Sequence, residues 1–276
     1  MPTIIAVVGD LHTNCTVGLC SPIVALDDGG QYRASREQRA VWREWLKFWN
    51  EVGVARDEAN ARLIIVLNGE LADDNHHVTL QLITRNPQTQ MAHAVEVLKP
   101  ALDLLREGDR VYVTRGTEAH SGPSAWMDEA IAQDIGATGE TKDGPASWWQ
   151  LRLNVEGVRI QVAHHPPPGG GRKEETRARW AIATAKDIEQ YHCDRDEPPP
   201  HLCIFGHVHN PADSFDVIRK CRVMVLPAWQ LRTSYGFRIG GTPLPIGGAW
   251  FLIDRGRIER VEKRYTDWRI GTYQHA

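Results

Sequence analysis

The chain has 276 residues, and its 32 lysines and arginines against 35 aspartates and glutamates give a net charge of −3. With 42% hydrophobic and 24% charged residues, the composition is that of an ordinary globular protein, which argues against intrinsic disorder. The near-neutral balance gives no global argument for nucleic acid or an anionic membrane as partner. The longest apolar stretches, 63–67 and 249–253, are far shorter than the roughly 20 residues of a membrane-spanning helix.

The amino terminus and the cysteines indicate the compartment. The first residues reach Asp10 without a basic region or the apolar core of a signal peptide, so we expect a cytoplasmic protein. The five cysteines show no C-x-x-C spacing, which argues against a disulfide framework and a structural zinc ribbon. No internal repeat or long linker is visible, so we expect a single domain over 1–276.

Short β-branched runs alternate with amphipathic helical segments along the chain. Ser35 and Gln38 fit a capping box at the start of the first helix, and Pro100 is expected to bend the second. The predicted helices are 36–52, 90–107, 124–135 and 172–191. The predicted strands are 3–8, 62–67, 110–114, 148–153, 158–163, 201–205, 222–226, 249–254 and 258–263.

One turn breaks the alternation of strand and helix. The sequence Asn154-Val155-Glu156-Gly157 predicts a hairpin between 148–153 and 158–163. Because a hairpin joins antiparallel strands, whereas strand–helix–strand units give parallel ones, we expect the sheets to be mixed.

Five predicted strands are followed by short segments rich in histidine and carboxylate side chains. Open α/β sheets bind ligands at the carboxyl ends of their strands. Histidine and carboxylate ligands without cysteine suit Mn, Fe, Zn or Ni and argue against a structural zinc site. The segments are Asp10-Leu11-His12, Asn68-Gly69-Glu70-Leu71-Ala72-Asp73, Gly116-Thr117-Glu118-Ala119-His120, Ala163-His164-His165 and Gly206-His207-Val208-His209.

In order and spacing, these segments resemble the calcineurin-like metallophosphoesterases, and more narrowly their phage-type members, from Val8 to Gln230. The family pattern is D-x-H, G-D-x-x-D, G-N-H-[DE], a histidine after a strand, and G-H-x-H. The resemblance implies a mixed α/β fold in which two mixed β-sheets pack as a sandwich flanked by helices, a four-layer αββα arrangement. It also implies a hydrolase that cleaves phosphate esters by in-line attack of a hydroxide bridging two divalent metal ions.

The resemblance also assigns the metal ligands. It implies that Asp10, His12 and His209 hold the first metal, while His164 and His207 hold the second. Two further carboxylates follow the second strand. Glu70 lies where the family has its bridging aspartate, so it either bridges with a changed metal separation or impairs the site, while Asp73 would orient a histidine without touching metal.

The third motif departs from the family pattern because its asparagine ligand is absent. The resemblance places His120 in the active site, as general acid for the leaving oxygen or as ligand of the second metal. Thr117 or Glu118 either takes the vacated coordination position or forms a polar turn beside it. Strand alternation turns His165 away from His164, which favours a core or supporting role.

The substrate class stays open at this point. A phosphodiester, nucleic acid or nucleotide is favoured by the basic residues Arg172, Lys173, Arg177 and Arg179, which follow the loop after His164. A phosphomonoesterase is the alternative within the same chemistry. A catalytically weakened scaffold protein of this fold is a further alternative, motivated by Glu70 and the missing asparagine. The oligomeric state is not predicted, and His76 and His77 either line the cleft or belong to a surface loop.

Overall fold

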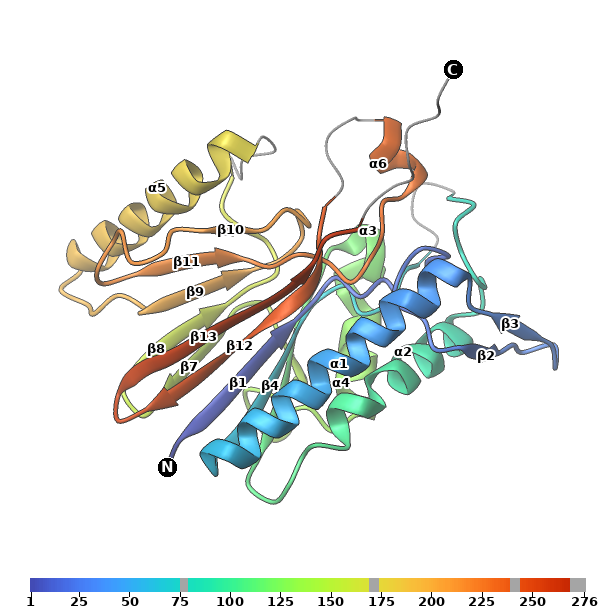
Figure 1. Cartoon of the computed structure of the whole chain (residues 1–276), viewed down its shortest axis with the longest axis horizontal. Coiled ribbons are helices and arrows are strands. Elements are labelled where there is room, and N and C mark those ends of the chain that lie inside the picture. Colours follow the sequence, from blue (N-terminus) through green and yellow to red (C-terminus); the bar gives the residue numbers. More distant parts are fainter. Residues whose placement is uncertain (75–78, 169–173, 239–243, 269–276) are drawn as a thin grey trace.

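The computed structural model describes residues 1–74, 79–168, 174–238 and 244–268. Its larger sheet has the order β13-β12-β1-β4-β5-β6 (Figure 1). Strands β1, β4, β5 and β6 are parallel, whereas β12 and β13 add to the edge in antiparallel fashion. The bounds are β1 (Thr3–Val8), β4 (Arg62–Asn68), β5 (Arg110–Thr114), β6 (Ser147–Trp148), β12 (Ile246–Asp254) and β13 (Arg257–Thr266).

The second sheet has the order β10-β11-β9-β8-β7, with three parallel central strands and an antiparallel strand on each side. Its strands are β7 (Leu151–Val155), β8 (Val158–Val162), β9 (Leu202–Phe205), β10 (Ala212–Asp213) and β11 (Arg222–Val225). A separate hairpin of β2 (Ile23–Ala25) and β3 (Gln31–Arg33) projects from the body of the protein. The prediction of mixed sheets is therefore confirmed.

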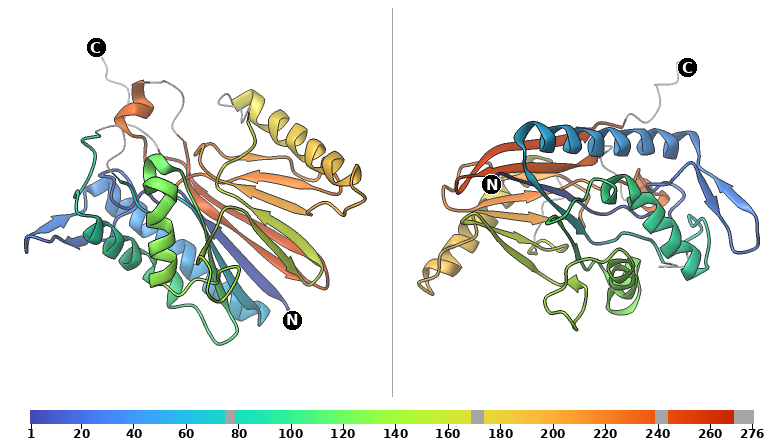
Figure 2. Two further views of the ribbon diagram at one scale, coloured as in Figure 1. Left: turned by 180° about the vertical axis from the view of Figure 1, so that it is seen from behind. Right: turned by 90° about the horizontal axis from the view of Figure 1, so that it is seen from below.

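The two sheets face each other, and helices cover both outer faces (Figures 1 and 2). Along β1, Ile5 and Val7 pack toward the second sheet, while Ile4 and Ala6 pack toward the helices, as the two-residue period of a strand requires. Helices α1, α2 and α4 lie on the larger sheet, and α5 lies on the smaller one. The helices are α1 (Arg36–Ala59), α2 (Pro87–Leu102), α3 (Glu118–Ser121), α4 (Trp126–Asp134), α5 (Glu174–Cys193) and α6 (Ser234–Arg238). This is the expected four-layer αββα sandwich.

Helices α1 and α2 differ most from their predicted bounds, whereas α4 and the end of α5 differ by one or two residues. Helix α1 carries the predicted Ser35–Gln38 capping box but continues beyond residue 52 to Ala59, where Asn60 takes up a left-handed φ of 45°. Helix α2 was predicted over 90–107, and it begins earlier because the Asn86 side chain accepts the N–H groups of the first turn. It ends at Leu102, two residues after Pro100, where the N–H of Asp103 bonds to the backbone oxygen of Lys99.

The segment 148–153 was predicted as one strand, and this is wrong. Trp148 belongs to β6 in the larger sheet, whereas Leu151 starts β7 in the smaller one. The chain crosses from one sheet to the other between these residues. The pattern suggested one strand because both Trp148 and Leu151 are apolar and pack between the sheets. The predicted hairpin between β7 and β8 is present. Among the described residues, no helix is both long enough and apolar enough to cross a bilayer.

Candidate metal centre

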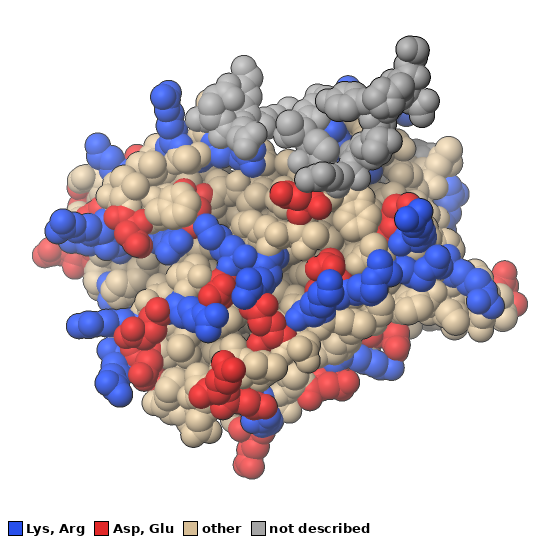
Figure 3. Space-filling view, viewed as in Figure 1, with Lys and Arg blue, Asp and Glu red and all other residues tan. Residues whose placement is uncertain are grey.

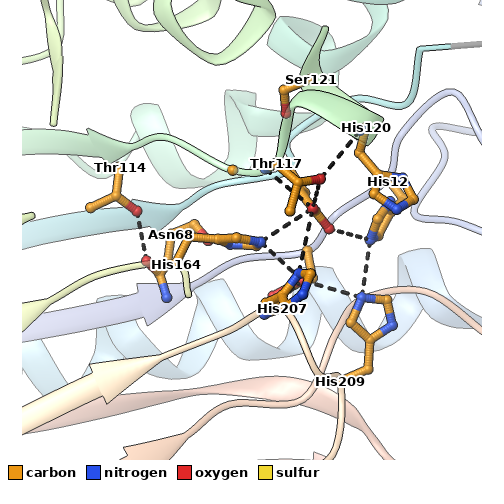
Figure 4. A network of polar contacts seen from close by, with 12 residues as sticks. His12, Asn68, Thr114, Thr117, His120, Ser121, His164, His207 and His209 are labelled. Carbon is orange, nitrogen blue, oxygen red and sulfur yellow. Dashed lines mark hydrogen bonds and ion pairs between the residues drawn. The ribbon is translucent and has the colours of Figure 1, made fainter. Parts of the chain in front are cut away.

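The five histidine- and carboxylate-rich segments converge at one edge of the sandwich, where β1, β4, β5, β8 and β9 end (Figure 4). They form three groups, in each of which the possible ligand atoms lie within 4.8 Å of one another. The groups are Asp10, His12, Glu70 and His209; Glu70, His164 and His207; and His12, Asp73 and His120. The structure therefore brings together all eight residues that the sequence singled out.

In the first group, the imidazole of His12 lies next to two other possible ligands. Its Nε2 lies 3.1 Å from Nε2 of His209 and 3.2 Å from Oε2 of Glu70. His209 Nε2 in turn lies 3.2 Å from Oδ1 of Asp10. Two imidazole nitrogens and two carboxylate oxygens thus face one small space.

The second group shares Glu70 with the first. His164 Nε2 lies 3.2 Å from Oε1 of Glu70, and His207 Nδ1 lies 3.9 Å from the same oxygen. Within the described part of the chain, neither of these buried nitrogens meets the geometry of a hydrogen bond. The Glu70 carboxylate therefore directs Oε2 toward one set of histidines and Oε1 toward the other.

The opposite ring nitrogens are held by acceptors behind the cluster. Asp73 Oδ1 accepts from His12 Nδ1 at 2.8 Å and from His120 Nδ1 at 2.6 Å. The backbone oxygen of Asn68 accepts from His164 Nδ1 at 2.8 Å. These contacts fix the tautomers of His12 and His164 so that Nε2 faces the cluster, the usual arrangement around metal-binding histidines.

The cluster carries strongly shifted ionisation. Burial alone would raise the pKa of Glu70, but the neighbouring histidines outweigh it and hold the pKa well below its usual range. Burial would also raise the pKa of Asp73, but the neighbouring His12 and His120 outweigh this effect and lower the pKa. Burial lowers the pKa of His164, yet Glu70 and Asp10 raise it to about 9. The carboxylates that shift these pKa values would equally favour a cation among the ring nitrogens.

Five of these residues have backbone conformations that amino acids other than glycine seldom adopt. The φ angles are 52° at Asp10, 46° at His12, 52° at Glu70, 69° at His207 and 55° at His209. Such angles persist only where the surroundings impose them, and they concentrate at functional sites.

Hydrogen bonds between the loops hold two of these residues by their backbone N–H groups. Asp10 N donates to Gly69 O at 2.9 Å, and His207 N donates to Asp10 Oδ1 at 3.0 Å. A Cβ at Gly206 would lie 2.5 Å from Asp10 Oδ2, so this approach requires glycine.

The altered third motif reaches the cluster through Thr117. Its hydroxyl donates to Glu70 Oε1 at 2.5 Å, and its backbone N–H points at the same oxygen at 3.3 Å. Glu118 instead accepts the N–H of Ser124 at 3.0 Å in an exposed position. Of the two residues considered for the vacated coordination position, Thr117 is the one that contacts the cluster.

Several further residues named from the sequence belong to none of the three groups or lie outside the described residues. His165 is exposed rather than in the core, because β8 already ends at Val162, and its ring lies 4.6 Å from that of His207. Arg177 donates to the backbone oxygen of Pro211 at 3.3 Å. His76, His77, Arg172 and Lys173 lie outside the described residues.

Sequence reasoning missed Asp128, a buried carboxylate on α4 that holds the loops of the second and third motifs together. The only local signal is an acid near the start of a helix, which is common because the helix dipole favours it.

A divalent cation fits this donor set. The ligand atoms converge, two buried histidine nitrogens lack hydrogen bonds among the described residues, and the opposite ring nitrogens are anchored. Imidazole and carboxylate together suit Mn, Fe, Zn or Ni. Sharing of Glu70 between two groups matches the ligand pattern of a two-metal site.

No protein-family model matches the sequence, and no curated protein matches it. Solved structures with detectable fold similarity include a predicted phosphoesterase from Streptococcus pneumoniae, with 12% identity, 92% of this chain and 84% of that one covered, and a TM-score of 0.35. Wild-type Vps29 from Entamoeba histolytica in complex with zinc has 11% identity, with 96% and 98% covered and a TM-score of 0.41. A purple acid phosphatase from yellow lupin has 10% identity, with 92% and 49% covered and a TM-score of 0.44.

Proposed function

We propose that the protein is a metal-dependent hydrolase of phosphate esters that acts on phosphodiesters. The observation that carries this proposal is the shared Glu70 carboxylate, with one oxygen 3.2 Å from His12 Nε2 and the other 3.2 Å from His164 Nε2. Asp10, His12, Glu70 and His209 would hold one cation, and Glu70, His164 and His207 the other. Divalent cations so held polarise phosphoryl oxygens and lower the pKa of water.

His120 would protonate the leaving group, and Asp73 would position His120. His120 Nδ1 donates to Asp73 Oδ1 at 2.6 Å, and the His120 side chain is 25% exposed. We assign to His120 the proton that the departing oxygen takes up. Asp73 orients the ring.

The charge around the centre favours a diester over a monoester. Among the described residues, Asp10 and Glu70 form ion pairs only with histidines, so no arginine or lysine adds positive charge to these ligands. Figure 3 shows basic and acidic side chains interspersed on the face that carries α1. On this helix, Lys47 pairs with Glu44 at 2.8 Å. Charge neutralisation would therefore fall to the cations, which suits the single negative charge of a phosphodiester, as in a nucleotide or nucleic-acid backbone.

Hydrolysis of two chromogenic esters tests both parts of the proposal. Chelator-treated protein should cleave neither bis-nitrophenyl phosphate nor nitrophenyl phosphate, and Mn or Ni should restore cleavage, with the diester faster. Asp10→Asn and His209→Gln should each lower kcat/KM by at least about 100-fold, because each removes a metal ligand. Asp57→Asn is the matched control, because Asp57 is exposed and pairs with Arg106.

The outcomes separate the alternatives. Faster cleavage of the monoester would overturn the diester assignment and support a phosphomonoesterase. Absence of hydrolysis with every divalent metal, together with an intact fold and no bound metal by elemental analysis, would replace the enzyme by a scaffold protein.

A further inference from the structure

A buried carboxylate outside the metal-binding groups joins the loop of Glu70 to the loop of Thr117. Asp128 lies in the first turn of α4 and is 0% exposed. Its two oxygens accept four hydrogen bonds from these loops. Oδ1 accepts from Leu71 N at 3.1 Å. Oδ2 accepts the other three, from Gly116 N at 2.7 Å, Ser121 Oγ at 2.8 Å and Glu70 N at 3.3 Å.

The two loops are in direct backbone contact at this point. A Cβ built on Gly116 would lie 2.6 Å from both N and Cγ of Glu70, and 3.0 Å from Asp128 Oδ2. Glu70 itself has the left-handed φ of 52°. Because both loops present N–H groups here, a side chain with two acceptor oxygens can satisfy all of them, and a carboxylate is such a group.

We propose that Asp128 is the positioning residue that sets the place of the Glu70 carboxylate between the two histidine groups. It acts through the backbone of Glu70 and through Gly116, next to Thr117, and it does not itself contact substrate or metal. The expected effect of Asp128 on catalysis rests on the proposed function. Its expected effect on metal affinity rests only on the geometry of the candidate metal ligands.

The next residue of the same helical turn provides a matched control. Glu129 also has a carboxylate with several hydrogen bonds, but none of its partners in the described part of the chain belongs to the Glu70 loop. It accepts from Ala146 N and Ser147 N, each at 2.9 Å, and from Arg115 Nη2 at 3.3 Å. Loss of Glu129 should therefore disturb the same helix while the hydrogen bonds from Glu70 and Leu71 to Asp128 stay in place.

The test compares Asp128→Asn with Glu129→Gln in the full chain. An amide has one acceptor oxygen, so at least one loop N–H of the Asp128→Asn variant faces an NH₂ group. Calorimetric titration with Mn²⁺ should show affinity lowered by about 10- to 100-fold. The kcat for the diester should fall by a similar factor while KM stays within about threefold. Glu129→Gln should keep both values within about threefold of the unmodified protein.

Wild-type Mn²⁺ affinity in Asp128→Asn, or an equal loss in Glu129→Gln, would overturn the inference. If Asp128→Asn does not fold, Ser121→Ala removes one of the four donors and should lower Mn²⁺ affinity by about threefold, and unchanged affinity would count against the inference. If the unmodified protein binds Mn²⁺ but cleaves no ester, the proposed function fails while the affinity comparison still decides the role of Asp128.

Discussion

Thr117 and Glu70 are joined by a 2.5 Å hydrogen bond from the threonine hydroxyl to Oε1 of the carboxylate. This oxygen is also the one 3.2 Å from His164 Nε2. A glutamate side chain has one more rotatable bond than an aspartate side chain. The hydroxyl of Thr117 restricts that freedom, because it holds the same oxygen that faces His164.

Thr117→Val should therefore lower both Mn²⁺ affinity and kcat/KM by about tenfold. A hydrogen bond to a charged group contributes about 1.5–3 kcal/mol, and valine keeps the shape of threonine without the donor. Thr117→Ser keeps the hydroxyl and should remain within about threefold of the unmodified protein. Equal kinetics and Mn²⁺ affinity in the valine and serine variants would show that this contact does not hold Glu70.

Asp73→Asn should lower kcat/KM by about 10- to 100-fold without abolishing metal binding. The carboxylate accepts from both His12 and His120, and an amide has only one acceptor oxygen and can oppose the Nδ1 proton with its own NH₂ group. Steady-state kinetics and elemental analysis of the same preparation check the two parts. A variant as active as the Asp57→Asn control would contradict this role.

The candidate site was largely predictable because its chemistry is concentrated in short segments at strand ends. Asp10, Glu70 and His209 each follow a β-branched run that the sequence identifies. The role of Asp128 was not predictable, since its donors come from two loops that only the folded sheet brings together. Thr117 could be named as a candidate, but its choice over Glu118 depends on a loop conformation that no local pattern specifies.

The fold was predictable where each element has its own periodicity. The alternating and helical patterns located β1 and α1, whereas the β2–β3 hairpin was not predicted. Its strands have three residues each, and only the central Val24 of β2 is buried, which is too short a pattern to distinguish from a loop. The crossing between β6 and β7 was missed because Trp148 and Leu151 are both apolar and belong to different sheets.

Asp109→Ala should lower the free energy of unfolding by about 3–5 kcal/mol, because it leaves the buried charge of Arg56 without its carboxylate partner. Arg56 Nη2 lies 2.6 Å from Asp109 Oδ2, with side-chain exposures of 5% and 2%. Asp109 Oδ1 also accepts the N–H of Leu63 at 2.8 Å, which ties this pair to β4. Urea unfolding measures the change.

The exposed pair of Asp57 and Arg106 gives the comparison for this prediction. Its side chains are 60% and 63% exposed, so Arg106→Ala should change the free energy of unfolding by less than about 1 kcal/mol. Similar losses in Arg106→Ala and Asp109→Ala would argue against a special contribution of the buried pair.

His93 should make the metal-free protein less stable below neutral pH. Burial lowers the pKa of this side chain to about 4 from the ordinary 6.5, and its Nε2 accepts the N–H of Ser21 at 3.3 Å. Between these two pH values the unfolded chain binds a proton that the folded chain does not, so stability falls as the pH decreases, by up to about 1.4 kcal/mol per pH unit.

His93→Gln removes this titration. The difference in unfolding free energy between the two proteins should be constant from pH 8 to 7 and should shift in favour of the variant from pH 6.5 to 5. Urea titrations of chelator-treated protein at each pH check this, because the other titrating groups are common to both chains and cancel in the difference. A difference that stays constant down to pH 5 would mean that His93 is protonated in the folded protein as readily as in the unfolded chain.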